Sequence, residues 1–566
     1  MSKTPNRWIG LVFISMAISL VIIDGTIVNT IFPAVIADLQ LSSTEVQWVQ
    51  ESYVLVFASL LLVWGTVGDR IGRRKLLIIG ILIFTAASIW AGFSTDASSM
   101  ILARIAQGVG GAMVLPTTLS LVNATFQGKE RGIAFAVWGS TIGGMVAVGP
   151  VLGGWLATDF DWRWAFNINA PLGLIIIAGL LIFATESKQA QREGKIDFVG
   201  AGISVVMFST LVFGLIEGRA YGWWTVNEGS NFAIGDFKWP ATGISVIPVS
   251  LAIFVISTVL FILWERSREK AQKNVILDLR LFSIASFRNG SIAAGIISMG
   301  EFGLLFAIPL WLQNVQGLSA ISSGLVLLWL AGGAFLASGV GGALNGKLSP
   351  TNAVRIGVLL ELIAVAGIAF IASTAGSWQG IAPFLALYGV GIGLATAQLT
   401  GVIMVDVPME KTGQASGSQS TVRQIGSALG IAVLGTVLFT STQASIETRI
   451  VNLESLSVVD APARQMLAET IAKPVADSAG AALESIPSYL TSQGVPELIA
   501  YDVKLAAADG FTDGMKATGW AAAFFLLLGL ASTYNLGTKA KTVATVKKPR
   551  AKAKPKPKPE AKTKAE

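Results

Sequence analysis

Charged residues are scarce in this sequence, and a few of them interrupt long apolar stretches, where a charge needs a chemical reason. Asp24 lies in the stretch 10–34, and Arg104 and Gln107 lie at a similar depth in the stretch 99–124. An ionised side chain at the centre of a bilayer costs on the order of 2.5–3.5 kcal/mol. Asp24 is therefore either a proton carrier tuned by Arg104 or half of a static ion pair between two helices. We expect Asp24 to carry protons and Arg104 to take part in the coupling.

The second half of the chain also carries polar residues that suit a binding pocket. Glu301 lies near the middle of the stretch 289–312, between glycines and next to Phe302. An acid among apolar and aromatic side chains favours a pocket that accepts a cation. We expect Glu301 and Phe302 to line a substrate cavity together with Asn29 and Gln107.

One further acid and one further base lie in the second half. Glu361 occurs in the inner part of the stretch 354–374, and Arg423 in the inner part of 414–440. Because both lie at a similar depth, the sequence predicts an ion pair between them.

A segment rich in glycine and charge separates the second and third apolar stretches. It contains Gly65, Asp69, Arg70, Gly72 and Arg73. The glycines allow a tight turn, and the aspartate can cap a helix N-terminus or pair with an arginine. Such a contact can form in one conformation and break in another. We therefore expect these five residues to act as a gate.

Glycine and proline gather again in the stretch 132–157, at Gly149, Pro150, Gly153 and Gly154. Proline interrupts the hydrogen bonds of a helix, and glycine lets a neighbouring backbone approach closely. The segment is either a kinked packing helix or a bend that controls access to a central cavity.

The elements that position these residues are predicted to be membrane-spanning helices. Of the 566 residues, 13% are charged, about half the share in a soluble domain, and the mean hydropathy is +0.65. A spanning helix needs about 20 predominantly apolar residues. Fourteen stretches qualify, namely 10–34, 46–67, 75–94, 99–124, 132–157, 164–184, 197–217, 244–264, 289–312, 322–344, 354–374, 381–405, 414–440 and 516–536.

The residue types that are missing exclude most enzyme chemistry. The chain contains no histidine and no cysteine, which excludes Ser-His-Asp catalysis, thiolate nucleophiles, disulfides and metal sites built from these residues. No glycine-rich loop for binding ATP phosphates occurs. The sequence predicts a protein that is not an enzyme and holds no cofactor or metal. Any proton carrier near neutral pH is then a carboxylate.

The distribution of lysine and arginine predicts the topology. Basic residues concentrate in alternate loops, such as 70–75 and 266–273, and such loops stay on the cytoplasmic side. We expect a multi-pass protein of the inner (cytoplasmic) membrane with both termini in the cytoplasm. The segment 538–566 holds eleven basic and two acidic residues, so the net charge of +7 is −2 without it. This segment is predicted to be disordered and to contact anionic lipids rather than nucleic acid.

The segment 441–515, on the outer side of this topology, is long and acidic. The residues 461–472 show an amphipathic helical pattern. The segment is either a small helical cap or a loosely ordered loop.

In their order and spacing, these motifs resemble those of one transporter group. The runs 24–33, 48–53, 65–75, 102–112, 149–154 and 162–173 are similar to motifs of the 14-helix drug/proton antiporters of the major facilitator superfamily, which include EmrB- and QacA-like exporters. The resemblance covers residues 8–537. In the motif that resembles the run 48–53, an acid often occupies the position of Glu51. We therefore expect Glu51 to relay protons near the outer mouth.

The resemblance implies an all-α integral membrane protein with the major facilitator fold. Its fourteen helices would form two six-helix bundles, at 1–185 and 289–537, and residues 186–288 would contribute two linker helices. The bundles would rock about a midplane site. The segment 441–515 would be an insertion in the second bundle, and 538–566 a tail.

The resemblance also implies a function. We expect a monomeric, proton-coupled antiporter that exports hydrophobic or cationic drugs and toxic compounds by alternating access, driven by the proton motive force. Two alternatives stay open: export of a lipid or cell-envelope amphiphile on the same scaffold, and a membrane sensor that transports nothing.

Overall fold

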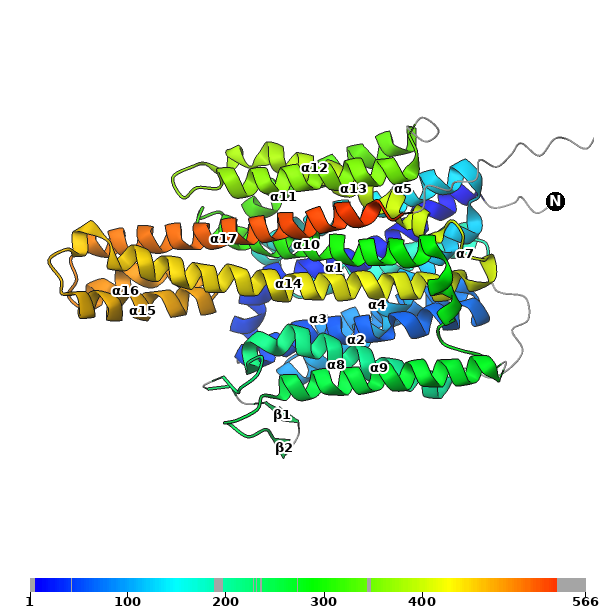
Figure 1. Cartoon of the computed structure of the whole chain (residues 1–566), viewed down its shortest axis with the longest axis horizontal. Coiled ribbons are helices and arrows are strands. Elements are labelled where there is room, and N and C mark those ends of the chain that lie inside the picture. The colour runs from blue at the N-terminus through cyan, green and yellow to red at the C-terminus, as the bar shows by residue number, and fades with distance from the viewer. Residues whose placement is uncertain are drawn as a thin grey trace, which may run out of the picture. The chain divides into compact units, whose positions relative to one another are not determined.

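The computed structural model describes residues 6–41, 43–187, 197–227, 229–230, 232–234, 237–271, 273–343 and 348–536, apart from some side chains within its helices. Its long helices lie side by side (Figure 1). They are α1 (Arg7–Leu39), α2 (Ser43–Ile71), α3 (Arg73–Gly92), α4 (Ala97–Thr125), α5 (Gly128–Asp159), α6 (Trp164–Asn167), α7 (Asn169–Phe183), α8 (Phe198–Tyr221), α9 (Val246–Lys270), α10 (Ala285–Asn314), α11 (Ala320–Ala343), α12 (Pro350–Ile371), α13 (Ala382–Met404), α14 (Thr412–Val451), α15 (Ala461–Asp477), α16 (Ile486–Ser492) and α17 (Glu497–Thr533).

Short elements connect these helices. Between α8 and α9, β1 (Ala233–Ile234) pairs with β2 (Phe237–Lys238) in an antiparallel hairpin. The 3₁₀ turns are η1 (Leu279–Ser283), η2 (Trp378–Gly380), η3 (Met409–Lys411), η4 (Glu454–Leu456) and η5 (Ala481–Ser485). The fold is thus almost entirely helical, as the sequence predicts.

The apolar composition explains why the chain folds into helices. Within a bilayer every backbone N–H and C=O needs an internal partner, and a helix supplies one for each. Among the described residues, twelve helices are long and apolar enough to cross a membrane. The remaining two predicted spans, 132–157 and 322–344, fall in α5 and α11. Since α11 contributes a shorter apolar run, Ile321–Ala337, the count of fourteen stays a prediction.

Polar side chains fix where several helices begin. Asp96 accepts a hydrogen bond from the backbone N–H of Ser99 at the start of α4. Asp197 and Ser349 cap α8 and α12 in the same way. Each cap satisfies a backbone donor that the helix itself leaves without a partner.

The buried apolar residues divide between the two halves of the chain. One large cluster runs from Leu11 to Ala184. Another runs from Met207 to Leu536 and also includes Leu62 of α2. Helices α2, α4 and α5 of the first half pack against α11, α13 and α14 of the second.

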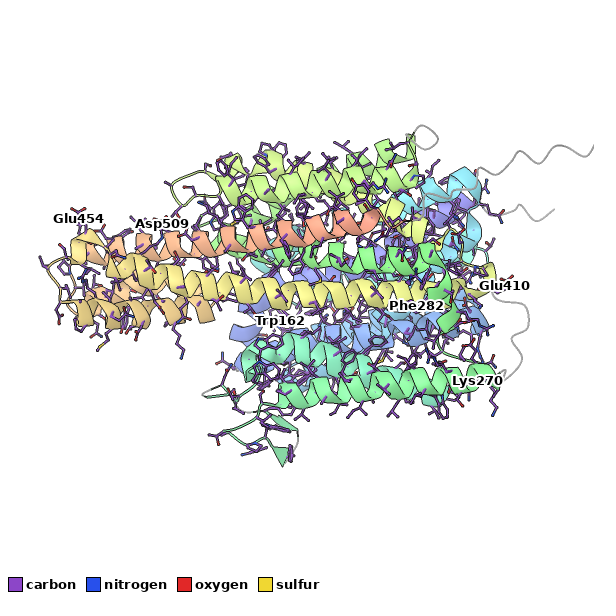
Figure 2. All side chains as sticks on the ribbon, in the orientation of Figure 1. Trp162, Lys270, Phe282, Glu410, Glu454 and Asp509 are labelled. Atoms are coloured by element: carbon purple, nitrogen blue, oxygen red, sulfur yellow. The ribbon has the colours of Figure 1, made fainter. Side chains whose placement is uncertain are left out.

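The bundle has two distinct ends, visible in Figure 2. Lys270 and Glu410 lie at one end, which we call the basic end. The last turns of α9 carry Arg266, Arg268 and Lys270, and the basic residues Arg70, Arg73, Arg74 and Lys75 adjoin Asp69, which bonds to Gly413 close to Glu410. Glu454 and Asp509 lie at the other, which we call the hairpin end.

At the hairpin end, the segment 441–515 is helical. The 40-residue helix α14 continues to Val451, and the 37-residue helix α17 starts at Glu497. Between them lie the shorter helices α15 and α16, which extend beyond the other helices (Figure 1). Helix α14 packs against α15, and α17 packs against both α15 and α16. The helix predicted over 461–472 is confirmed as part of α15.

Glycines let α11 and α13 approach closely. A Cβ on Gly333 would overlap the backbone of Ala386, and Cβ atoms on Gly389 and Gly393 would overlap the backbone of α11. The neighbouring Gly332 has open space at the same position. Small residues of this kind are typical of helix contacts in membranes, where close backbone packing supplies much of the attraction.

We predict that Gly333→Ala destabilises the protein and that Gly332→Ala does not. The added methyl of Gly333→Ala has to displace backbone, which costs about 1–3 kcal/mol. Thermal unfolding of both purified variants in detergent measures the difference. Equal unfolding temperatures for the two variants would contradict the packing described here.

Candidate functional site

An ion pair lies buried inside the first half of the bundle. The Arg104 guanidinium on α4 donates to the Asp24 carboxylate on α1 at 2.7 Å, and both side chains are almost completely buried. The structure thus brings together the two residues that the sequence assigned to proton coupling. Burial makes the pair interdependent, because removing either charge leaves the other without compensation in a low-dielectric environment.

Neutral side chains complete the coordination of Asp24. Gln107 accepts from Arg104 at 2.6 Å and donates to Asp24 at 2.8 Å. Asn169, at the start of α7, also donates to Asp24, at 3.0 Å. Ser88 of α3 accepts from Gln107 and Asn169 at 2.7 and 3.1 Å. Four helices therefore contribute to one network around a single carboxylate.

Helix α2 covers the cationic side of this network. The Arg104 guanidinium carbon lies 4.3 Å from the ring centroid of Tyr53, and Arg104 Nε donates to the Val49 carbonyl at 3.3 Å. A cation over an aromatic face is stabilised by the ring quadrupole. The side chains of Glu51 and Asn29 lie outside the described part of the structure.

The sequence interpretation missed three residues of this network. Asn169, Ser88 and Tyr53 are neutral, and neutral polar residues are common in spanning helices. The runs 48–53 and 162–173 contain Tyr53 and Asn169, so their motif resemblance was a usable signal. Gln107, predicted to line a substrate cavity, hydrogen-bonds to Asp24 instead of facing an open space.

The glycines of α5 pack directly on the helix that carries Asp24. A Cβ on Gly149 would overlap Thr26, and one on Gly153 would lie 2.8 Å from Ile27. On its other side α5 meets α11, where a Cβ on Gly154 would lie 2.5 Å from the Ile321 side chain. Helix α5 therefore touches both the Asp24 helix and the second half of the chain. The side chain of Pro150 lies outside the described part.

At the basic end, Asp69 joins the two halves. Its carboxylate accepts from Arg73 at 2.7 Å and from the backbone N–H of Gly413 at 3.1 Å. Gly413 lies in the first turn of α14, where the helix dipole favours a negative charge. A Cβ on Gly65 would lie 2.6 Å from the Gly413 carbonyl. Of the five residues predicted to act as a gate, Gly65, Asp69 and Arg73 therefore lie at this contact. Arg70 lies beside it, at the end of α2.

The turn between α2 and α3 requires a glycine. Gly72 has a φ of 109°, a conformation that favours glycine over other residues. Just after it, the Glu186 carboxylate accepts from the backbone N–H groups of Arg74 and Lys75 at 3.0 and 3.1 Å. Glu186, which the sequence interpretation did not include, therefore caps the first turn of α3. The next residue, Ser187, holds Arg73, because its carbonyl accepts from the Arg73 backbone N–H at 3.0 Å and its hydroxyl accepts from the Arg73 guanidinium at 3.1 Å.

The segment between α9 and α10 crosses the same contact. Thr66 of α2 donates to the Ile276 carbonyl at 2.7 Å, and Gln414 of α14 donates to the Val275 carbonyl at 3.0 Å. One stretch of backbone therefore bonds to both halves of the bundle at the basic end.

An ion pair holds the end of this segment. Asp278 pairs with Lys411 and accepts from the backbone N–H of Arg280 at 3.0 Å. Burial alone would raise the pKa of the Asp278 carboxyl, but these partners outweigh burial and lower the pKa below its ordinary value. The stabilisation from this carboxylate is therefore present at neutral pH and is lost only as the pH falls through the lowered pKa.

In the second half, the acids are arranged differently from the prediction. Arg423 of α14 lies 3.9 Å from Glu301 of α10. Glu361 of α12 is fully buried, and neither of its carboxylate oxygens has a hydrogen-bond partner among the described residues. The predicted Glu361–Arg423 pair is thus wrong for this conformation, because Arg423 reaches Glu301 instead. Glu301 is buried and Phe302 half-buried.

Comparison with known proteins identifies the family. The family model described as Major Facilitator Superfamily matches residues 14–431. The chain belongs to this superfamily. It is a multi-pass membrane transporter rather than an enzyme, and its relatives are resistance and export proteins.

Three relatives illustrate the similarity. The chain is 28% identical to the tetracenomycin C resistance and export protein of Streptomyces glaucescens, over 88% of this chain and 90% of that protein. It is 30% identical to the multidrug resistance protein Stp of Mycobacterium tuberculosis, over 81% and 80%. It is 28% identical to the multidrug efflux pump LfrA of Mycolicibacterium smegmatis, over 94% and 96%.

A solved structure shares the fold. The human organic anion transporter MFSD10 (TETRAN) aligns with a TM-score of 0.56 and 11% identity, over 92% of this chain and 100% of that one. At this identity the likeness supports the major facilitator fold alone.

We predict that Asp69→Asn favours conformations in which the basic end is open. The variant loses the charge that binds Arg73 and the first turn of α14, and hydrogen bonds to charged groups contribute about 1.5–3 kcal/mol. The ratio of open to closed molecules should therefore rise about tenfold or more. Because the chain has no cysteine, spin labels on introduced cysteines at the exposed Gln127 and Glu410 report the distance across this end.

The matched control is Glu130→Gln. Glu130 pairs with Arg7 on the exposed surface within the first half of the chain, so this variant should leave the distance distribution unchanged. An Asp69→Asn distribution that matches wild type would show that the Asp69 contact does not hold the basic end closed.

Proposed function

We propose that this transporter exports hydrophobic or cationic compounds from the cytoplasm in exchange for protons. In this proposal the protein is a monomer in the inner membrane, and the basic end and both termini face the cytoplasm. The bundles at 1–185 and 289–537 rock against each other, and 186–288 links them. The relatives named for tetracenomycin and multidrug export support small hydrophobic substrates.

The buried Asp24 network carries this proposal. A carboxylate in the interior of a spanning bundle costs too much to be incidental, and Asp24 has three side-chain donors from two other helices. With no histidine in the chain, a carboxylate is the group able to exchange protons near neutral pH. Asp24 fits this role.

Protonation of Asp24 would change the energy of the whole network. The neutral acid no longer balances the buried Arg104, and an uncompensated buried charge is strongly destabilising. The helices then move to give Arg104 another partner or water. Proton binding and conformational change are linked in this way, without ATP.

Helix α5 supports a path from this network to the rest of the protein. Its Gly149 and Gly153 lie flush against α1, and Gly154 lies against α11. A shift of α1 after protonation therefore displaces α5 and, through it, the second half. The Asp69 contact with α14 opens and closes the basic end in the same cycle.

The first two substrate-binding residues in this proposal lie on α10 in the second half. Glu301 offers a negative charge and Phe302 an aromatic face, which together suit a lipophilic cation. Asn29 and Glu51 complete the proposal, as a cavity residue and as an outer proton relay. The tail 538–566 contacts anionic lipids.

We predict that Asp24→Asn abolishes active export. Asparagine preserves the shape of the side chain but cannot release a proton. In a pump-deficient bacterial host loaded with ethidium, wild-type protein should drive efflux that an uncoupler stops. The variant should leave ethidium retention at the level of cells without the transporter, with equal amounts of protein in the membrane.

Asp38→Asn is the matched control. Asp38 lies near the end of the same helix, where it is exposed and pairs with Arg163, so efflux should persist. Full-rate, uncoupler-sensitive efflux by Asp24→Asn would overturn the assignment of Asp24 as the proton carrier.

A further inference from the structure

The second half of the bundle contains an unbalanced set of charges. In the first half, Asp24 is matched by Arg104 at 2.7 Å. In the second half, the two buried acids Glu301 and Glu361 have a single arginine, Arg423, near them. If both acids were ionised, the cluster would carry a net negative charge inside the membrane, where charge is costly.

Glu361 is the acid without compensation. Its side chain is 0% exposed, and neither carboxylate oxygen has a hydrogen-bond partner among the described residues. Arg423 lies 3.9 Å from the other acid, Glu301. An isolated ionised carboxylate in apolar surroundings is so unfavourable that the group neutralises by binding a proton.

The helices around Glu361 offer no other charge. Helix α13 packs on α12 closely enough that a Cβ on Gly391 would lie 2.5 Å from Glu361 Cγ, and its one ionisable residue is Tyr388. The Tyr388 hydroxyl donates to the Glu301 backbone carbonyl at 3.0 Å. Helix α17, the other neighbour, has no ionisable residue between Ala517 and Thr533.

We propose that Glu361 is a second proton-binding site, which carries a proton in this conformation in addition to the proton exchanged at Asp24. This inference rests on the proposed proton-coupled export. Arg423 is the partner that makes the site reversible, because its side chain is 21% exposed and lies outside normal hydrogen-bond distance of Glu301. A movement of Arg423 from Glu301 toward Glu361 stabilises the ionised form of Glu361 and releases its proton.

This exchange links the second proton to the substrate. When Arg423 leaves Glu301, the Glu301 carboxylate becomes available to a cationic compound. One guanidinium shared by two acids therefore connects substrate binding at Glu301 with proton release at Glu361. The atoms balance simply: the proton leaves the Glu361 carboxyl for water, and the arginine charge replaces it.

Infrared spectroscopy of the purified protein tests the proton on Glu361 without any substrate. A buried protonated carboxyl gives a C=O band that shifts when H₂O is replaced by D₂O. We predict that Glu361→Gln loses a band of this kind that wild type shows at neutral pH. The variant should fold, because glutamine resembles the neutral acid.

Two controls make the infrared result decisive. Glu469→Gln removes an exposed glutamate on α15 and should leave the band unchanged, and Asp24→Asn should also retain it. An unchanged band in Glu361→Gln would overturn the proposal, because the proton would then not reside on Glu361.

Transport in reconstituted vesicles tests the coupling. At an imposed pH gradient of about one unit, the loss of one exchanged proton lowers the highest ethidium accumulation ratio about tenfold. We predict this reduction for Glu361→Gln, with export retained. A ratio equal to wild type would overturn the coupling. If wild type itself accumulated no ethidium, the proposed function would fail, while the infrared band would still decide the proton on Glu361.

Discussion

A charge buried inside a membrane protein needs an opposite charge or hydrogen-bond donors close to it. The ion pair between Asp24 and Arg104 satisfies this requirement, since both side chains are buried and lie 2.7 Å apart. The pair fixes the relative rotation of α1 and α4, and the donors from Gln107 and Asn169 add α7 to the same arrangement. Since these side chains are buried away from bulk solvent, a lost partner is replaced only if the helices move, and the network is intact or it is rearranged as a whole. A single proton can therefore have a large structural effect.

In the proposed mechanism, contacts elsewhere in the bundle transmit such a rearrangement. Glycines bring α5 into backbone contact with α1, and also against α11. At the basic end, Asp69 holds the first turn of α14, and the segment between α9 and α10 bonds to both α2 and α14. This second attachment connects α9, and α8 packed on it, to the contact between Asp69 and α14.

Residue type and depth in the membrane predicted much of this arrangement. The remaining contacts could not be predicted, because they depend on how each helix is rotated about its axis. Asp24 and Arg104 could be paired from sequence because each is the charged residue in its span. The same reasoning failed for Glu361 and Arg423, because depth does not say which face of a helix a side chain occupies. Asn169 and Ser88 were missed because their hydrogen-bond partners lie on helices far apart in the chain. A neutral polar residue in a spanning helix does not by itself indicate which other helix it contacts.

The central claim is that proton exchange at Asp24 is coupled to movement of the exported compound. The most direct measurement is the internal pH of vesicles that contain the purified protein alone, recorded while an ethidium gradient is imposed. The account predicts that ethidium movement drives opposite proton movement in wild type and that Asp24→Asn abolishes both. Ethidium transport by wild type with no change in internal pH would contradict it.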